Sequence, residues 1–268
     1  MVLCFQKNHL KNDNLVKGIK NMEQNYYDTL CTEMYEILHK DAPQDELEFY
    51  LSYAQKGMSI LEPLCGSGRF LVPFLERGLA IKGIDSSQAM LEKLLKKAPD
   101  AIVVQSKIEE YQTTEHFDYI FISSGSVSLF TDMQLCRMIL FKMSKFLKKG
   151  GKFVFAVDTV ANYCPDQEDH SSEIVVNIDQ GCQLVLETKK RYDVATHTLF
   201  CPSLYKLYQN DILLQQEQMN FQTHLYELGE MEEMLREIGF IEIKVYSSFK
   251  KEIAKTNHSE SFLYECSI

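Results

Sequence analysis

The feature that most constrains this chain is an apolar segment that runs into a glycine-rich turn. Residues 60–71 read Ile-Leu-Glu-Pro-Leu-Cys-Gly-Ser-Gly-Arg-Phe-Leu, and residues 83–87 read Gly-Ile-Asp-Ser-Ser. Gly66 and Gly68 carry no Cβ, so the backbone of the turn can approach a ligand closely before a helix begins with free N-terminal amides. A second apolar run ends at Asp85. The pattern predicts a strand, a glycine turn, a helix and a second strand that ends in an acid.

This arrangement indicates a nucleotide-sized pocket. The carboxyl ends of adjacent parallel strands meet at one sheet edge, so Asp85 is expected beside the glycine turn, where it accepts hydrogen bonds from both hydroxyls of a ribose. A dinucleotide fingerprint has a third glycine where this chain has Leu71, and no P-loop sequence occurs. Glu62, just before the turn, would repel a pyrophosphate and attract a sulfonium or an ammonium. The turn therefore favours a cationic ligand.

Apolar runs and helical patterns alternate between residues 60 and 158. The order is strand, helix, strand, helix, strand, strand, helix, strand, which predicts a doubly wound parallel sheet. Two helical patterns precede it within residues 23–56, and the last part of the chain predicts one helix and two closing strands.

Residues 62–69, Glu-Pro-Leu-Cys-Gly-Ser-Gly-Arg, resemble the first motif of class I S-adenosylmethionine-dependent methyltransferases, in the form common among enzymes that act on small molecules. Asp85 matches the ribose-binding acid of that family. Residues 117–122 resemble its fourth strand, and residues 147–155 resemble the lead-in to its fifth. The resemblance covers residues 23–160 and 225–268.

The resemblance implies a seven-stranded, mostly parallel α/β sheet and S-adenosyl-L-methionine as the cofactor. It also implies a set of cofactor-binding residues, namely Glu62, Leu64, Gly66, Gly68, Arg69, Asp85, Ser86, Lys107, Ile108 and Ser123. One position departs from the family. After the third strand the family usually has an acid or an amide that bonds the adenine amino group, whereas this chain has Lys107, which cannot accept a hydrogen bond. The adenine is then held by the Ser106 backbone, by packing on Ile108 and by another acceptor such as Glu109, or the register differs by a residue or two.

Residues 161–224 have a different pattern. Four β-rich segments, 174–178, 183–194, 198–209 and 213–224, are separated by turn signals, which predicts antiparallel hairpins. They are inserted between the fifth strand and the last helix, and they resemble the lid of sugar-amine and glycine-type N-methyltransferases. We expect an N-terminal arm at 1–22, a core of 23–160 and 225–268, and a lid at 161–224. The lid carries contacts to the acceptor or, alternatively, a dimer interface.

Two residues are candidates for a catalytic role. Methyl transfer needs mainly alignment and exclusion of water, but a hydroxyl acceptor benefits from a base, and His224 lies where the lid returns to the core. The alternative for His224 is an exposed strand residue. By resemblance, the segment that begins at Tyr26 folds over the cofactor and places a tyrosine ring near the sulfonium, where the ring attracts a cation. The alternative is an aromatic side chain that anchors a helix to the core.

The composition of the chain argues against several classes of substrate and partner. The net charge of −10 argues against nucleic acid as a substrate, and five lysines within residues 142–152 are expected to face solvent near a helix end. The eight cysteines form no C-x-x-C and suggest no metal site. No apolar run approaches the length of about 18 residues that a transmembrane helix needs, and no signal peptide is evident. These features predict a cytoplasmic protein, a monomer or a homodimer, without membrane contact. Cys65 is expected as a small residue in the turn, with a nucleophile as the alternative.

The sequence thus predicts methyl transfer from S-adenosylmethionine to nitrogen or oxygen of a small-molecule acceptor. The alternatives are a protein or tRNA methyltransferase and a cofactor-binding protein without catalysis.

Overall fold

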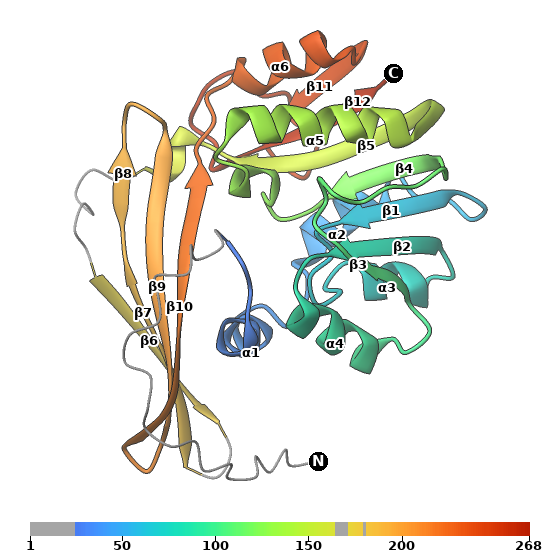
Figure 1. Ribbon diagram of the computed structural model, residues 1–268. Coiled ribbons are helices and arrows are strands. Elements are labelled where there is room, and N and C mark those ends of the chain that lie inside the picture. Colours follow the sequence, from blue (N-terminus) through green and yellow to red (C-terminus); the bar gives the residue numbers. More distant parts are fainter. Residues whose placement is uncertain (1–24, 164–170, 179–180) are drawn as a thin grey trace.

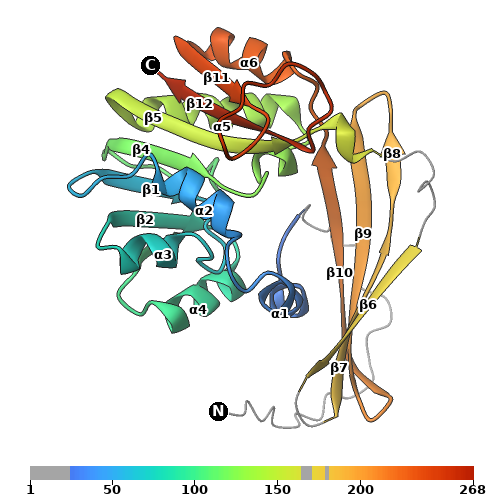
Figure 2. The same ribbon diagram turned by 180° about the vertical axis from the view of Figure 1, so that it is seen from behind.

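The computed structural model describes residues 25–163, 171–178 and 181–268. A large sheet with helices on both faces lies beside a long antiparallel sheet, and helix α1 (Thr29–Leu38) lies between the two (Figures 1 and 2). The N-terminal arm expected at 1–22 lies outside the described residues.

The large sheet has seven strands in the order β11-β12-β5-β4-β1-β2-β3. Strand β12 runs antiparallel to both of its neighbours, and every other neighbouring pair is parallel. The predicted doubly wound, mostly parallel sheet is therefore confirmed. The strands are β1 (Ser59–Pro63), β2 (Ala80–Asp85), β3 (Ile102–Gln105), β4 (Phe117–Ile122), β5 (Leu147–Asp158), β11 (Glu242–Tyr246) and β12 (Ser261–Ser267).

Helices cover both faces of this sheet because its strands carry apolar side chains on both faces. On β5, Phe153 and Phe155 belong to the core beneath one set of helices, while Val154 and Ala156 belong to the core beneath the other. Alternate residues of a strand point to opposite faces, so one strand supplies two cores. The first set is α5 (Met133–Phe146) and α6 (Glu230–Ile238); the second is α2 (Gln44–Leu51), α3 (Leu71–Glu76) and α4 (Gln88–Lys97). Short 3-10 turns occur at Val127–Leu129 (η1) and Val160–Asn162 (η2).

The second sheet is antiparallel, with the order β10-β9-β7-β6 and β8 paired with β9. It is inserted between β5 and α6, as predicted. Its strands are β6 (Ser171–Ile178), β7 (Cys182–Lys189), β8 (Arg191–Asp193), β9 (Thr198–Gln209) and β10 (Ile212–His224). The single strand predicted at 183–194 is wrong, because β7 and β8 are separate. The break lies opposite Cys201 and Pro202 of β9, where proline has no N–H to donate to a ladder.

Helix α1 is bound to the antiparallel sheet by polar and apolar contacts. The Glu217 carboxylate, on β10, accepts hydrogen bonds from the backbone N–H groups of Leu30 (2.8 Å) and Cys31 (3.1 Å) at the start of the helix. These donors have no partner within the helix itself. Apolar side chains of α1, with Met34 fully buried, pack on the same sheet. Just before α1, the Asn25 side chain bonds the backbone of Gln222 on β10 in both directions, at 2.8 and 2.9 Å.

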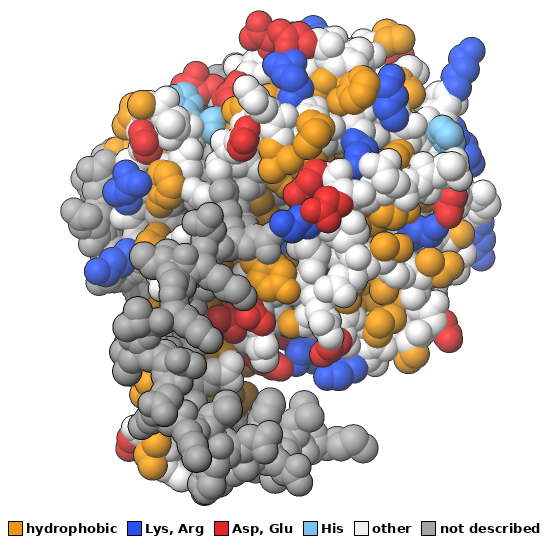
Figure 3. Space-filling view, viewed as in Figure 1, with side chains coloured by type: hydrophobic (Ala, Val, Ile, Leu, Met, Phe, Trp, Pro, Cys, Tyr) orange, Lys and Arg blue, Asp and Glu red, His pale blue; other side chains and the backbone are white. Residues whose placement is uncertain are grey.

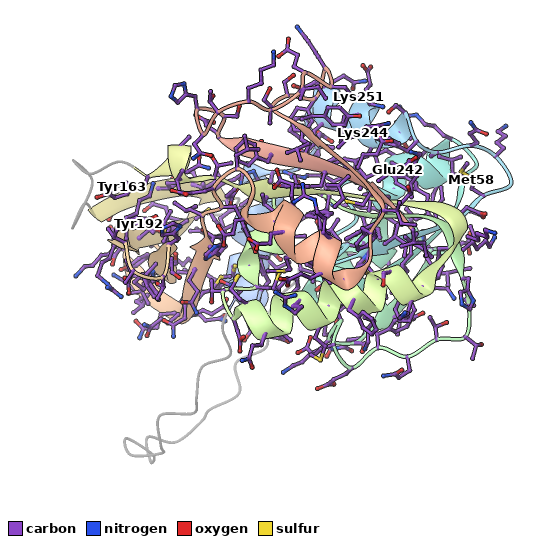
Figure 4. The ribbon with its side chains drawn as sticks, turned by 90° about the horizontal axis from the view of Figure 1, so that it is seen from above. Met58, Tyr163, Tyr192, Glu242, Lys244 and Lys251 are labelled. Atoms are coloured by element: carbon purple, nitrogen blue, oxygen red, sulfur yellow. The ribbon has the colours of Figure 1, made fainter. Side chains whose placement is uncertain are left out.

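A buried carboxylate joins three elements at the other end of the molecule. Glu265, on β12, accepts hydrogen bonds from Lys152 (2.5 Å), Lys244 (3.2 Å), Tyr53 (3.0 Å) and Tyr246 (2.9 Å). Burial alone would raise the pKa of this carboxyl, but the hydrogen bonds outweigh burial and lower its pKa to about 2. Figure 4 shows Lys244 near Lys251 in this region.

Replacing Glu265 with glutamine is expected to lower the free energy of unfolding at pH 7 by about 2–3 kcal/mol. The folded pKa lies below the unfolded value of 4.5, so the ionised form stabilises the fold above pH 4.5, and this stability is lost as pH falls through about 2. The variant should therefore lose less stability than wild type between pH 5 and pH 2 in urea unfolding. Glu242→Gln, at an exposed carboxylate on β11 (Figure 4), is the matched control and should behave like wild type.

Candidate active site

Three adjoining cavities lie at the carboxyl edge of the large sheet. The central cavity, about 260 Å³, lies over the glycine turn. The outer cavity, about 460 Å³, extends between α1 and the antiparallel sheet, and the side cavity, about 250 Å³, lies over the loop after β3. The central and outer cavities share Tyr27, Tyr35, His39, Asp158, Phe221 and Thr223. The central and side cavities share Asn25, Leu64, Ser86 and Leu129.

Asp85 holds the glycine turn against the end of β2. Its carboxylate accepts hydrogen bonds from the backbone N–H groups of Gly66 and Ser87, each at 2.8 Å. Burial raises the pKa of Asp85, and these hydrogen bonds oppose the rise. The turn passes through a left-handed conformation at Leu64 (φ 58°) and again at Gly66 (φ 52°). Both residues line the central cavity, as do Arg69, Asp85 and Ser86.

Three of the expected cofactor residues do not line any of these cavities. Gly68 packs against α4: an added Cβ would lie 2.8 Å from Leu94 Cγ. Glu62 is 1% exposed, and its Oε1 accepts a hydrogen bond of 3.4 Å from the Ser123 hydroxyl. Burial raises the pKa of Glu62 well above the usual range, and its Oε2 has no hydrogen-bond partner within the described residues.

Arg69 links the glycine turn to the loop after β4. Its guanidinium donates to the Ser124 hydroxyl and lies 5.7 Å from the centre of the Tyr35 ring. Ser124 in turn donates its backbone N–H to the Glu46 carboxylate of α2, at 2.8 Å. The Nε of Arg69 is buried, and no residue of the described chain accepts its hydrogen bond. Three buried polar atoms at this turn, Arg69 Nε, Glu62 Oε2 and Ser67 Oγ, thus have no hydrogen-bond partner among the described residues.

Lys107 and Ile108, predicted to bind the cofactor, line the side cavity together with Ser106 and Glu109. Ile108 is 3% exposed. Lys142 of α5 donates to the backbone carbonyl of Ile108 at 3.3 Å, among other carbonyls of this loop. The expectation that all lysines of 142–152 face solvent is therefore wrong for Lys142, which holds the loop under the side cavity.

The tyrosines before α1 line different cavities. Tyr26 borders the side cavity, whereas Tyr27 borders the central and outer cavities. Burial is the largest of the effects that raise the pKa of Tyr27. The Ser87 hydroxyl, which also caps α4, donates to the Tyr27 carbonyl at 2.5 Å. The start of α4 therefore holds the backbone of Tyr27 in place.

His224, the predicted base, does not line the cavities. Its Nδ1 lies 3.1 Å from the Thr196 carbonyl, and its Nε2 lies 2.7 Å from the Glu230 carboxylate of α6. It is 5% exposed, so the alternative of an exposed strand residue is wrong. Both ring nitrogens are engaged, and the ring joins β10 to α6.

Two polar residues that were not predicted from the sequence face the central and outer cavities. They are His39, just after α1, and Asp158, the last residue of β5. Burial, and then the nearby Arg69 charge, lower the pKa of His39. The one signal in the sequence is that Asp158 ends an apolar strand, as Asp85 does, and parallel strands end at a common edge.

Cys65 is 4% exposed, and burial raises the pKa of its thiol well above the usual range. Such a thiol stays protonated, which is typical of a structural cysteine and not of a nucleophile. No group of three or more His, Cys, Asp or Glu side chains that could hold a metal occurs within residues 25–163, 171–178 and 181–268.

Residues 60–151 match a family model described as a methyltransferase domain. This part of the chain is a methyltransferase domain. It contains the glycine turn, Asp85, Ser106–Glu109 and the loop after β4, so the family match and the cavities coincide. The family expected from the sequence is confirmed for these residues. No curated protein sequence matches the chain.

Solved structures extend the likeness of fold beyond the methyltransferase domain. An S-adenosylmethionine-dependent methyltransferase from Clostridium acetobutylicum has 13% identity and a TM-score of 0.72, over 88% of this chain and 96% of that chain. The sugar N-methyltransferase KedS8 from Streptoalloteichus has 15% identity and a TM-score of 0.71. The match covers 97% of this chain and 99% of that chain. The CcbJ methyltransferase from Streptomyces caelestis has 16% identity and a TM-score of 0.68. The match covers 91% of this chain and 98% of that chain. The antiparallel sheet therefore belongs to a fold that these methyltransferases share.

Proposed function

We propose that the protein transfers a methyl group from S-adenosylmethionine to nitrogen or oxygen of a small molecule. The observation that carries this proposal is the pair of adjoining cavities. The central cavity lies over the glycine turn of the methyltransferase domain, and the outer cavity is lined by α1 and the antiparallel sheet. A small acceptor enclosed there is aligned with the methyl donor and shielded from water, which is the main requirement of an in-line transfer.

The residues of the central and side cavities fit the cofactor. Asp85 supplies carboxylate oxygens for ribose hydroxyls, and the apolar Ile108 supplies a surface for the adenine ring. The tyrosine rings at the central cavity, above all Tyr27, suit a sulfonium because an aromatic face attracts a cation. Arg69 lines the central cavity, and its unpaired Nε suits the charged methionine portion, directly or through water. The cofactor supplies an electrophilic methyl group on a cationic sulfur.

We assign residues 161–224 to the acceptor-binding lid. The outer cavity is lined on one side by β9 and β10, through Leu199, Cys201, Ser203, Tyr205, Met219 and Phe221. The name of KedS8, a sugar N-methyltransferase, supports a small acceptor. His224 is assigned a structural role at the junction of lid and core, because both of its nitrogens are engaged. Of the two tyrosines, Tyr27 and not Tyr26 is assigned to the sulfonium.

Two alternatives are less well supported. A protein or tRNA substrate needs an accessible site, and a tRNA substrate also needs a basic surface. The net charge is −10, and acidic and basic side chains are interspersed on the face drawn in Figure 3. A binding protein without catalysis would need no acceptor cavity. No helix in the described part of the chain is long and apolar enough to cross a membrane.

The test is methyl transfer from tritium-labelled S-adenosylmethionine to three kinds of acceptor: a panel of small amines and alcohols, a mixture of proteins, and total tRNA. We expect label only in the small-molecule fraction. Label in protein or tRNA would contradict the proposed acceptor class. Cofactor binding without transfer to any fraction would favour the non-catalytic alternative.

A further inference from the structure

Asp158 is a carboxylate without a partner among the described residues, at the junction of the central and outer cavities. Its backbone is held firmly: its N–H donates to the Ser128 hydroxyl at 2.7 Å, and its carbonyl accepts from the Tyr226 N–H at 2.9 Å. Its side chain, in contrast, neither receives a hydrogen bond nor forms an ion pair with any residue that the structure describes. The residue is half-buried, and a carboxylate withdrawn from solvent in this way is normally paired or hydrogen-bonded. Asp158 therefore has the character of a group that binds a ligand.

The carboxylate lies against Gly125 in the loop after β4. A Cβ built on Gly125 would come within 2.7 Å of Asp158 Oδ1, so only glycine leaves room for this side chain. Gly125 also lines the central cavity. The glycine in the loop after β4 therefore creates space for an acid.

The charged and titratable groups around the two cavities leave Asp158 uncompensated. On the sheet side are Asp85 and Arg69, and Arg69 is engaged by Ser124 and Tyr35. From α1 and the residues on either side of it come Tyr27, Cys31, Tyr35 and His39, and from the antiparallel sheet and its connections come Lys190, Cys201 and Tyr205. None of these makes an ion pair with Asp158. Burial raises the pKa of Asp158 to about 7.

We propose that Asp158 binds the ammonium group of an amine acceptor and takes one proton from it before methyl transfer. This inference rests on the proposed function and narrows its acceptor from nitrogen or oxygen to an amine. A cation is the ligand that best compensates a half-buried carboxylate without a partner among the described residues, since a hydroxyl would leave its charge unbalanced.

The proton and electron balance is simple. An ammonium acceptor gives one N–H proton to the Asp158 carboxylate, which becomes a carboxylic acid, and the nitrogen regains its lone pair. The nitrogen then forms a bond to the methyl carbon while the carbon–sulfur bond breaks, and the electron pair of that bond stays on sulfur. The product is a methylated ammonium and a neutral thioether. A base is most effective when its pKa lies near the working pH, and Asp158 meets this condition.

The test compares benzylamine with benzyl alcohol, two probes that share the ring and differ in the charged group. Their binding to protein saturated with S-adenosylhomocysteine is measured by ligand-observed NMR for wild type, Asp158→Asn and Asp100→Asn. Asp100 is an exposed aspartate in the turn before β3 and serves as the matched control. Wild type and the control should bind benzylamine at least about tenfold more tightly than benzyl alcohol. Asp158→Asn should lose this preference and keep its affinity for the alcohol.

The pH dependence separates a charge effect from a structural one. Benzylamine stays protonated between pH 6 and pH 8, so its affinity for wild type should rise about tenfold over this range as Asp158 ionises. The affinity of Asp158→Asn should stay flat. Equal binding of the two probes to wild type, or an unchanged preference in Asp158→Asn, would overturn the inference alone. Failure of wild type to bind S-adenosylhomocysteine would instead overturn the proposed function.

Discussion

Replacing Asp85 with alanine is expected to weaken binding of S-adenosylmethionine and S-adenosylhomocysteine by about 100-fold or more, a loss of about 3 kcal/mol. Two effects combine. The variant lacks the acceptor for the ribose hydroxyls, and a hydrogen bond to a charged group contributes about 1.5–3 kcal/mol. It also frees the Gly66 and Ser87 N–H groups, which Asp85 holds at 2.8 Å in the wild-type turn.

Titration calorimetry with both ligands measures this loss directly, and thermal unfolding checks it. A ligand at 100 times its Kd stabilises a protein by about 2.7 kcal/mol, so wild type should unfold about 5–10 °C higher when saturated. The shift should vanish in Asp85→Ala. Asp85→Asn keeps one carbonyl acceptor and should fall between the two. If Asp85→Ala bound both ligands as tightly as wild type does, the ribose would have to be held elsewhere. Asp100→Ala is the control for the loss of an acidic charge.

The glycine turn was predictable because its signal is local. A strand, a turn that needs left-handed conformations, a short helix, a second strand and a capped helix follow one another within residues 59–97. Ser87, for example, caps α4 through a bond from Met90 N–H only three residues away. Strand β9 likewise spans 198–209, as its alternation and its turn signals indicate. Features set by neighbours along the chain can be read from the sequence.

Features set by distant neighbours could not be read in this way. The type and position of His224 predict a candidate base, but Thr196 and Glu230 engage both of its nitrogens. The break between β7 and β8 depends on Pro202 of another strand. The sequence also does not tell which cavity Tyr26 and Tyr27 border, because adjacent residues of an extended segment point in opposite directions. Each case depends on a partner that has no fixed spacing from the residue itself.

In the candidate site, the surroundings of Asp158 likewise could not be predicted from the sequence. Its position at the end of β5 follows from the strand pattern, but its environment comes from three separated parts of the chain. Gly125 leaves room for the carboxylate. Tyr27 and His39 line the cavities from either end of α1, and Phe221 lines them from β10. An apolar strand followed by an acid predicts that the acid lies at the carboxyl edge of the sheet. It does not predict that the acid has no partner among the described residues.

Replacing Gly68 with alanine is expected to destabilise the fold by about 3 kcal/mol while leaving the cavity lining intact. The Gly68 φ of 83° lies in the left-handed region, which costs a residue with a Cβ about 1–2 kcal/mol. The new methyl would also lie 2.8 Å from Leu94 Cγ and 3.0 Å from Val72 Cγ2. Leu94 is fully buried, so it has little room to move, and overpacking of this kind costs about 1–3 kcal/mol.

Urea unfolding of three glycine variants separates these two contributions. Gly57 has a φ of 90°, and nothing lies within 4 Å of the place that an added methyl would occupy, so Gly57→Ala reports backbone strain alone, about 1 kcal/mol. Gly66 has a φ of 52° and one neighbour, Met90 Sδ at 4.0 Å. Gly66→Ala should therefore lose little more stability than Gly57→Ala, but it should bind S-adenosylhomocysteine more weakly, because Gly66 lines the central cavity. Equal destabilisation by Gly68→Ala and Gly57→Ala would contradict packing against α4 as the reason for glycine at position 68.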